Sequence, residues 1–528
     1  MRNFETPGRS AAYGTNGMAA TSHPRATLAA LDILRAGGNA IDAAVSAAAV
    51  LAVVEPQMTG IGGDCFVLYA PAGGDVVAYN GSGRACAAAT TQWYLENGIT
   101  EIATDSAHAV TIPGVVEAWS RLVQDHGTSE LGALLEAAIE LAETGYPIQP
   151  RVAFDWARFE AKLQANEPTR RKFLNDGRPF KAGDQFSQPE LAVTLREIAR
   201  KGADGFYKGR VAEAMVVTLN KLGGLQTVDD FARTQGDYCD PISTSYRGYE
   251  VVECPPNGQG FIALIMLNIL EGFDLAGLDP SGSQRLHLEI EAGRLAFRDR
   301  DRYFSGRDRS AEHLQTYLAK DYADRQRSLI SAERAMSKSQ ASALPAQSDT
   351  VYLTVVDRDA NAVSFINSLF SPFGSGLLCD ETGVMFHDRG TLFVVDENSG
   401  NTIDPGKQPV HTILPGMLAQ NGRAVMPFGV MGAQYQPFGH THLLTNILDH
   451  GLDIQTALEH PRVFYQDDTV LAESGIAADA VAELEALGHT VEPTVSPHGG
   501  GQAIWIDWDG GVFIGGSDPR KDGCALGY

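Results

Sequence analysis

The stretch TVYLTVVDRDANAVSFINSLF, residues 350–370, decides how this chain folds. Two runs of alternating β-branched and aromatic residues flank the polar turn DRDAN, residues 357–361. Alternation of this kind is typical of strands, and a short polar connection between two such runs is typical of a β-hairpin. We therefore predict that a strand begins at Thr350 and pairs with the strand that follows it.

The register of this hairpin determines which side chains face each other. A three-residue loop after Asp357 sets Thr354 opposite Ser364 in antiparallel pairing. The same register sets Thr350 opposite Ser368, although a shift by one residue would turn one strand's side chains to the other face. We predict that the Ser368 hydroxyl faces Thr350.

The residues before Thr350 have a different character. The stretch SAERAMSKSQASALPAQSD, residues 331–349, is polar, rich in Ser and Ala, and interrupted by one proline. Because it has little apolar surface to bury, it is typical of an exposed linker. We expect the Asp349–Thr350 junction to be accessible and flexible.

The chain before this linker has mainly helical patterns. In residues 23–56, apolar residues recur at helical spacing on both sides of a glycine pair, which predicts two helices. The next segment, TGIGGDCFVLYA at residues 59–70, is a glycine turn leading into a strand, and residues 76–80 complete a second hairpin. Further helical patterns cover residues 114–165, 189–202 and 210–224.

The composition is that of a globular protein. The chain has 528 residues, of which 44% are hydrophobic and 20% charged, and this length allows one to three domains. Asp and Glu outnumber Lys and Arg by 65 to 41, and the net charge of −24 repels phosphate backbones and anionic lipids. Nucleic acids and membrane surfaces are therefore poor partners, although a few arginines can still form a local positive pocket.

Targeting and metal-binding patterns give only negative indications. No apolar run has the length of a signal peptide or a membrane span, so we expect a cytoplasmic protein. The cysteines are scattered without a CxxC pair, which indicates neither a zinc site nor a disulfide framework. They are Cys65, Cys86, Cys239, Cys254, Cys379 and Cys524.

Several long segments, in fixed order, resemble the gamma-glutamyltransferase family. Residues 350–376 are similar to the start of the family's small subunit, where a strand begins with the nucleophile. The other similar segments are residues 23–64, 111–120, 248–260, 405–415 and 517–528. The resemblance therefore spans almost the whole chain.

This resemblance implies both a fold and a maturation step. The fold is the α+β N-terminal nucleophile hydrolase type, a four-layer αββα sandwich with two stacked β-sheets between helical layers. Autocleavage of the Asp349–Thr350 bond would give a large subunit, residues 1–349, and a small subunit, residues 350–528, intertwined in one domain. The resemblance also allows a dimer of such processed heterodimers.

The resemblance assigns the nucleophile to Thr350, and chemistry explains why this residue must become an N-terminus. A threonine hydroxyl is too weakly acidic to attack an amide at neutral pH, whereas a free α-amine has a pKa of about 8 and can act as the adjacent base. The attack gives an acyl-enzyme through a tetrahedral oxyanion, which water or an acceptor amine then resolves. This chemistry needs no metal and no organic cofactor.

Three more catalytic positions follow from the resemblance. Ser368 is the second hydroxyl residue of the expected site. A glycine pair that offers backbone N–H groups to the oxyanion in the family resembles GVMGA, residues 429–433, which assigns this role to Gly432 and Ala433. An alanine at this position is unstrained if its φ is negative and strained if the position is left-handed.

The substrate-binding positions depart from the gamma-glutamyl pattern. The arginine that binds the substrate α-carboxylate in the family aligns with Ser82, and Arg84 lies two residues further on. Thr391 and Leu392 replace the acidic pair that binds the substrate ammonium, and Phe370 replaces an asparagine. Because an ammonium ion buried without a counter-charge is unfavourable, we expect a substrate that has no amino group.

Four residues are candidates for binding the substrate instead. Arg84 and Arg389 can each hold a carboxylate through two parallel hydrogen bonds. His411 and Thr412 replace the family's paired serines, and His411 either donates to a substrate oxygen or packs. A pocket with positive groups and no acidic ones would suit a small anionic amide such as oxamate, and the chain looks like the family's oxamate amidohydrolases.

Other functions stay open at this point. A gamma-glutamyltransferase or glutathione hydrolase would need Arg84 or Arg389 to replace the missing clamp, and a cephalosporin acylase would need an enlarged apolar pocket. A noncatalytic descendant would cleave itself without turnover. A dinucleotide-binding loop at TGIGGD is disfavoured, because its glycines precede a strand, whereas the glycines of the Rossmann fingerprint follow one.

Overall fold

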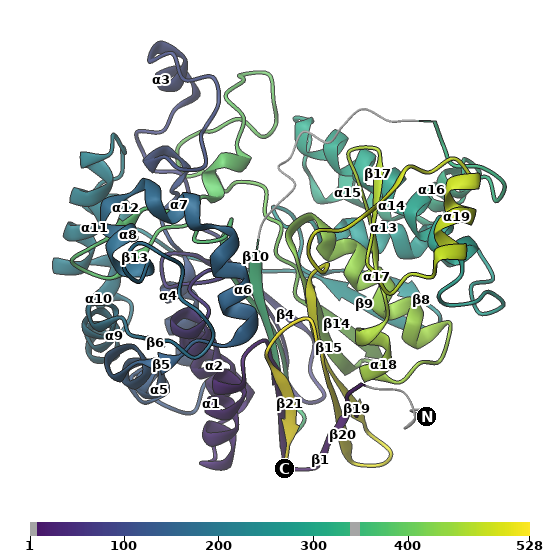
Figure 1. Ribbon diagram of the computed structural model, residues 1–528, viewed down its shortest axis with the longest axis horizontal. Helices are drawn as coiled ribbons and strands as arrows, with labels where there is room; N and C mark the ends of the chain where they lie inside the picture. Colours follow the sequence, from purple (N-terminus) through teal and green to yellow (C-terminus); the bar gives the residue numbers. More distant parts are fainter. Residues whose placement is uncertain (1–7, 338–348) are drawn as a thin grey trace.

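The computed structural model of the chain describes residues 8–337 and 349–528, and it has four layers (Figure 1). Two seven-stranded sheets lie face to face at the centre, and helices cover the outer side of each sheet. The predicted αββα sandwich is therefore confirmed. The inner faces of the two sheets are buried against each other.

Both sheets are built from strands that precede Thr350 and strands that follow it. The β10 sheet contains, in spatial order, β21 (Cys524–Gly527), β2 (Gly17–Thr21), β10 (Asp349–Asp357), β11 (Ala362–Phe370), β3 (Asp64–Ala70), β4 (Val77–Gly81) and β7 (Asp237–Cys239). The β15 sheet contains β1 (Ala12–Gly14), β20 (Val512–Ser517), β19 (Gly500–Asp507), β15 (Arg423–Met431), β14 (Gly416–Gln420), β9 (Tyr249–Glu253) and β8 (Ile242–Tyr246). The two parts of the chain therefore share one core.

Helices from the first half of the chain cover the β10 sheet (Figure 1). α1 (Pro24–Arg35) and α2 (Ala40–Val54) lie against it, and every residue of α2 is buried because its many alanines allow close packing on both sides. The other helices of this layer are α3 (Thr91–Glu96), α4 (Val115–His126), α5 (Leu131–Thr144), α6 (Pro150–Arg158), α7 (Glu160–Ala165), α8 (Glu167–Phe173), α9 (Pro189–Lys201), α10 (Asp204–Tyr207), α11 (Arg210–Lys221) and α12 (Val228–Ala232).

The remaining helices lie on the side of the β15 sheet (Figure 1). They are α13 (Gly260–Leu270), α14 (Ser283–Ser305), α15 (Ala311–Leu318), α16 (Lys320–Arg327), α17 (Gln436–Leu448), α18 (Ile454–Glu459) and α19 (Ala478–Ala486). Three small sheets complete the described structure: β5 (Tyr146–Pro147) with β6 (Gln185–Phe186), β12 (Leu378–Cys379) with β13 (Val384–Met385), and β16 (Val463–Gln466), β17 (Thr469–Ala472) and β18 (Val491–Pro493).

The β10–β11 hairpin has the predicted register over most of its length. Thr354 pairs with Ser364, as the loop length predicts. Beyond Val351 the pairing shifts by one residue, so Thr350 lies at a β-bulge opposite two residues of β11. The direct pairing that we predicted for Thr350 is therefore replaced by a bulge, a feature that redirects side chains and is common beside active sites.

The predicted exposed linker falls largely outside the described residues. Residues 331–337 are described and are partly exposed, whereas residues 338–348 are not described. Within the described ranges, no helix has both the length and the apolar character that are needed to cross a bilayer.

Candidate active site

Thr350 lies at the buried start of β10. Its side chain is fully enclosed, so the expectation of an accessible junction is wrong at Thr350, which the β10 strand buries. Thr350 Oγ1 donates a hydrogen bond to Ser368 Oγ over 3.2 Å. The predicted contact between these two hydroxyls is confirmed, although a bulge replaces the regular pairing. In the uncut chain the Thr350 nitrogen belongs to an amide, so the hydroxyl has no neighbouring amine base.

Arg389 joins two hydroxyl groups of this site. It begins the short 3-10 helix η2 (Arg389–Leu392), and its guanidinium is completely buried. Nη2 donates to Ser368 Oγ and Nη1 donates to Thr412 Oγ1, each over 3.0 Å. Burial lowers the pKa of Arg389 to about 10, against the opposing effect of nearby carboxylates, so the side chain keeps its charge at neutral pH.

Phe370 supports both Ser368 and Arg389. Its backbone N–H donates to Ser368 Oγ over 2.8 Å, and its ring centroid lies 4.6 Å from the Arg389 guanidinium carbon. Phe370 has a φ of +76°, a left-handed conformation that costs about 1–3 kcal/mol in a bulky residue. The packing around the site must hold this residue in place.

Asp64 is an acidic member of the cluster that the sequence pattern did not reveal. Its Oδ2 lies 3.2 Å from His411 Nε2 and 3.8 Å from Arg389 Nε, and its Oδ1 accepts from the Gly83 N–H over 2.8 Å. The expectation of a pocket without acidic groups is therefore wrong. The available signal was the aspartate that ends TGIGGD, at the first position of β3.

The neighbours of Asp64 and His411 set the charges of both groups. Burial raises the pKa of the Asp64 carboxyl, but His387, His411 and Arg389 outweigh it and lower the pKa to about 2. Burial and then the Arg389 charge lower the pKa of His411 to about 3. At neutral pH, His411 is thus a neutral imidazole whose Nε2–H donates to the Asp64 carboxylate, so its predicted donation to a substrate oxygen is disfavoured.

Gly432 and Ala433 form a left-handed turn directly after β15. Their φ angles are +118° and +54°, so Ala433 has the strained conformation, at a cost of about 1 kcal/mol. The 3-10 helix η3 (Ala433–Tyr435) begins here, and the N–H of its first residue has no acceptor within the helix. Gln259 Nε2 donates to the carbonyl oxygens of Ala433 and Thr412, each over 3.2 Å, which ties this turn to the Arg389 cluster.

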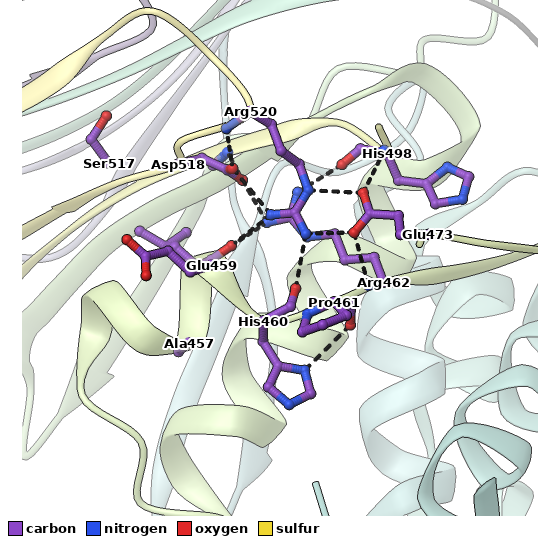
Figure 2. Close-up of polar contacts among 12 residues, drawn as sticks. Ala457, Glu459, His460, Pro461, Arg462, Glu473, His498, Ser517, Asp518 and Arg520 are labelled. Atoms are coloured by element: carbon purple, nitrogen blue, oxygen red, sulfur yellow. Dashed lines mark hydrogen bonds and ion pairs between the residues drawn. The ribbon is translucent and has the colours of Figure 1, made fainter. Parts of the chain in front are cut away.

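A buried network of ion pairs around Arg462 and Asp518 holds the segment on which this turn packs, and Figure 2 shows the network's polar contacts. The turn packs tightly on the next segment, since a Cβ on Gly432 would lie 2.9 Å from Gly499 Cα. Arg462 holds that segment: its Nη1 donates to the His498 carbonyl over 2.7 Å, and its Nη2 lies 2.7 Å from Asp518 Oδ2. The charges of Arg462 and Asp518 therefore fix the backbone on which Gly432 rests.

Comparison with known proteins identifies the family to which these residues belong. Residues 26–528 match the family described as gamma-glutamyltranspeptidase. The chain belongs to this family. As a member of the gamma-glutamyltranspeptidase family it has the N-terminal nucleophile hydrolase fold, and it is an amide-hydrolysing enzyme.

Individual members of the gamma-glutamyltranspeptidase family resemble the chain over its full length. The chain is 36% identical to the glutathione hydrolase-like YwrD proenzyme of Bacillus subtilis, over 97% of this chain and 99% of that protein. It is 33% identical to the oxamate amidohydrolase proenzyme of Klebsiella pneumoniae, over the same shares of the two chains, 97% and 99%. The crystal structure of cephalosporin acylase from Bacillus halodurans superimposes with a TM-score of 0.92 at 37% identity and covers 100% of this chain and 99% of that one.

Arg84 lies apart from the buried cluster around Arg389. Its side chain is 40% exposed, forms an ion pair with Asp237, and donates from Nη1 to the Gly406 carbonyl over 3.1 Å. It borders a surface cavity of about 310 Å³. The prediction that Arg84 binds substrate is thus not supported by its position, and Arg389 is the arginine that adjoins the Thr350–Ser368 pair.

Thr391 and Leu392, which replace the acidic pair of the gamma-glutamyl pattern, have structural contacts in this chain. Thr391 Oγ1 donates to the Ile102 carbonyl over 2.9 Å, and Leu392 is buried. Neither residue offers a negative charge where the family has its acidic pair. Among the described residues, Asp64 is the carboxylate that forms an ion pair with Arg389.

Proposed function

We propose that this protein is a self-processing threonine amidohydrolase, cut at Asp349–Thr350 into subunits of residues 1–349 and 350–528. The observation that carries the proposal is the hydrogen bond from Thr350 Oγ1 to Ser368 Oγ at the start of β10. Cleavage would convert the Thr350 amide nitrogen into an α-amine with a pKa of about 8, next to the hydroxyl that it must activate.

Each bond change in the proposed reaction has a group that accepts or supplies the proton. The α-amine takes the proton from Thr350 Oγ1 while this oxygen attacks the substrate amide carbon. The carbon–nitrogen bond then breaks, the leaving nitrogen takes the proton, and the acyl group remains as an ester on Thr350. Water then attacks this ester while the same amine takes its proton, and the amine returns this proton to Thr350 Oγ1 as the acyl carbon–Oγ1 bond breaks. The N–H groups of Gly432 and Ala433 donate to both oxyanions.

For the substrate, we propose a small amide with a carboxylate beside the scissile carbonyl, and oxamate fits this description best. Arg389 Nη2 donates one N–H to the Ser368 hydroxyl, and Nη1 donates one N–H to the Thr412 hydroxyl. Each of these nitrogens carries a second N–H. A substrate carboxylate could accept these remaining N–H groups, and would be a second anionic partner of the guanidinium beside Asp64, which lies 3.8 Å from Arg389 Nε. The similarity to an oxamate amidohydrolase supports this assignment.

A gamma-glutamyl substrate is the second candidate. Asp64 places a buried carboxylate in the cluster, 3.8 Å from Arg389 Nε, and this restores an acidic group that the substituted positions lack. The similarity to a glutathione hydrolase-like protein points in the same direction. A cephalosporin is the third candidate: the similarity to a cephalosporin acylase supports it, but such a substrate would need an enlarged apolar pocket, whereas the groups around Ser368 and Thr412 are polar.

The test compares the processed enzyme on matched substrates. Oxamide has the same size as oxamate but carries an amide in place of the carboxylate. A charge-assisted hydrogen bond contributes about 1.5–3 kcal/mol, so we expect kcat/KM to be about 10- to 100-fold higher for oxamate than for oxamide. Equal values for the two would contradict the carboxylate assignment, and turnover of a gamma-glutamyl anilide alone would establish the second candidate.

A further inference from the structure

A second cluster of polar side chains, outside the candidate active site, has the composition of a metal site. His287 and Glu291 lie one helical turn apart on α14 and are completely buried. His489 joins them from the turn between α19 and β18, and one ligand atom from each residue lies within 4.8 Å of the other two. We propose that these three residues bind a divalent transition-metal ion, with Zn²⁺ as the best fit.

His287 already has the orientation of a metal ligand. Its Nε2 lies 2.7 Å from the Ser331 carbonyl oxygen, which can only accept, so Nε2 carries the hydrogen and Nδ1 has the lone pair. Metal-bound histidines usually donate their second ring N–H to a carbonyl or carboxylate in this way. His287 Nδ1 faces His489 Nε2 over 2.8 Å, and an ion would enter between them after the His489 proton moves to its own Nδ1.

Glu291 has the capacity to be the third ligand. Its Oε1 accepts from Arg294 Nη1 and its Oε2 accepts from the Met336 N–H, each over 2.8 Å, and each oxygen retains a lone pair. The Arg294 charge weakens the attraction for a cation but also orients the carboxylate. Two imidazoles and one carboxylate favour Zn²⁺, whereas Mg²⁺ and Ca²⁺ prefer oxygen ligands alone.

The position of this cluster indicates a structural role for the ion. His287 and the neighbouring Arg294 hold residues 331–337, the end of the first described range. The Ser331 carbonyl accepts from His287, and Arg294 donates to the carbonyl oxygens of Met336 and Ser337 over 2.9 and 2.7 Å. A bound ion would fix α14, the α19–β18 turn and residues 331–337 to one another, away from the reacting groups in the β10 sheet.

The test uses the full-length protein without a histidine tag, stripped of metal with a chelator and then titrated with Zn²⁺. We expect one equivalent to bind and to raise Tm, because an ion that binds only the folded state stabilises it. His489→Gln should weaken binding by at least about 10-fold and remove the Tm increase. His313→Gln is the matched control, since the His313 ring packs on Tyr303 and Tyr317 in the α15 region, and should bind as the wild type does.

A second readout does not depend on any variant. Co²⁺ in place of Zn²⁺ should give the intense visible absorption of a four-coordinate site with histidine ligands. The proposal is overturned if the wild type binds no Zn²⁺, if His489→Gln binds it as tightly as the wild type, or if added Co²⁺ keeps the spectrum of the hydrated ion. Should His489→Gln fail to fold, the cobalt spectrum of the wild type decides between these outcomes.

Discussion

In the proposed mechanism, cleavage of the one peptide bond before Thr350 would turn an enclosed hydroxyl into a nucleophile with its own base. The position of this residue followed from local sequence, because a polar linker ends where a strand pattern begins, and hairpin pairing brings Ser368 to the same place. The charged and polar groups around these hydroxyls did not follow from local patterns. Asp64 and His411, for example, are 347 residues apart and meet only through the tertiary fold.

The strain at Ala433 leads to a prediction for a pair of substitutions. Ala433→Gly removes a Cβ from a position with a φ of +54°, so we expect the free energy of unfolding to rise by about 1 kcal/mol. Activity should persist, because the backbone N–H remains. Chemical denaturation of the processed protein measures the first effect, and an amidase assay measures the second.

Adding a Cβ at the neighbouring position, in Gly432→Ala, should abolish most of the activity. In Gly432→Ala the new Cβ would lie 2.9 Å from Gly499 Cα, which displaces the turn and its N–H groups. Loss of one oxyanion donor lowers kcat by about 100- to 1000-fold, and we expect a loss of this size. Full activity in Gly432→Ala would show that this turn does not bind the oxyanion.

At the scale of elements, the sequence was most informative where periodicity was strong. The two helices predicted in residues 23–56 are α1 and α2, separated at Gly37 and Gly38, and the predicted strand of residues 59–70 is β3. The bulge at Thr350 escaped prediction, because the alternation within the hairpin gives no information on contacts such as those that the Phe370 N–H and Arg389 make with Ser368 Oγ.

The end of α2 gives a pH-dependent prediction. Glu55 is buried there, and burial, opposed by Lys521, raises the pKa of its carboxyl to about 7 from an ordinary value of 4.5. Between these two values the folded chain holds a proton that the unfolded chain releases. Stability should therefore fall by about 3 kcal/mol as the pH rises from 4.5 to 7.

Glu55→Gln isolates this contribution. The variant carries no titrating group at this position. Its free energy of unfolding should therefore fall less than that of the wild type between pH 4.5 and 7, by the contribution of Glu55. Denaturation of the wild type and the variant across this pH range gives the difference directly. Parallel pH profiles for the two proteins would contradict the raised pKa of Glu55.

At the scale of the whole molecule, the two proposed subunits cannot be separated without dismantling both sheets. β10 pairs with β2 in one sheet and β14 pairs with β9 in the other, so each sheet contains hydrogen-bonded neighbours from before and after Thr350. We expect the two fragments to stay together after cleavage. They should elute as one species in size-exclusion chromatography and separate only in denaturant, and elution as two species in native buffer would contradict the shared core.

The most direct test of the account is the intact mass of the wild type beside Thr350→Ala and Thr354→Ala. Thr354 lies in the same strand as Thr350 and makes its side-chain hydrogen bond to the Val363 carbonyl, so it is a matched control for loss of a threonine hydroxyl from β10. We predict that the wild type and Thr354→Ala separate into two fragments, the smaller beginning at Thr350, and that Thr350→Ala stays whole and inactive. A Thr350→Ala chain that is still cut, or a wild-type chain that hydrolyses amides without being cut, would contradict the assignment of Thr350 as the nucleophile.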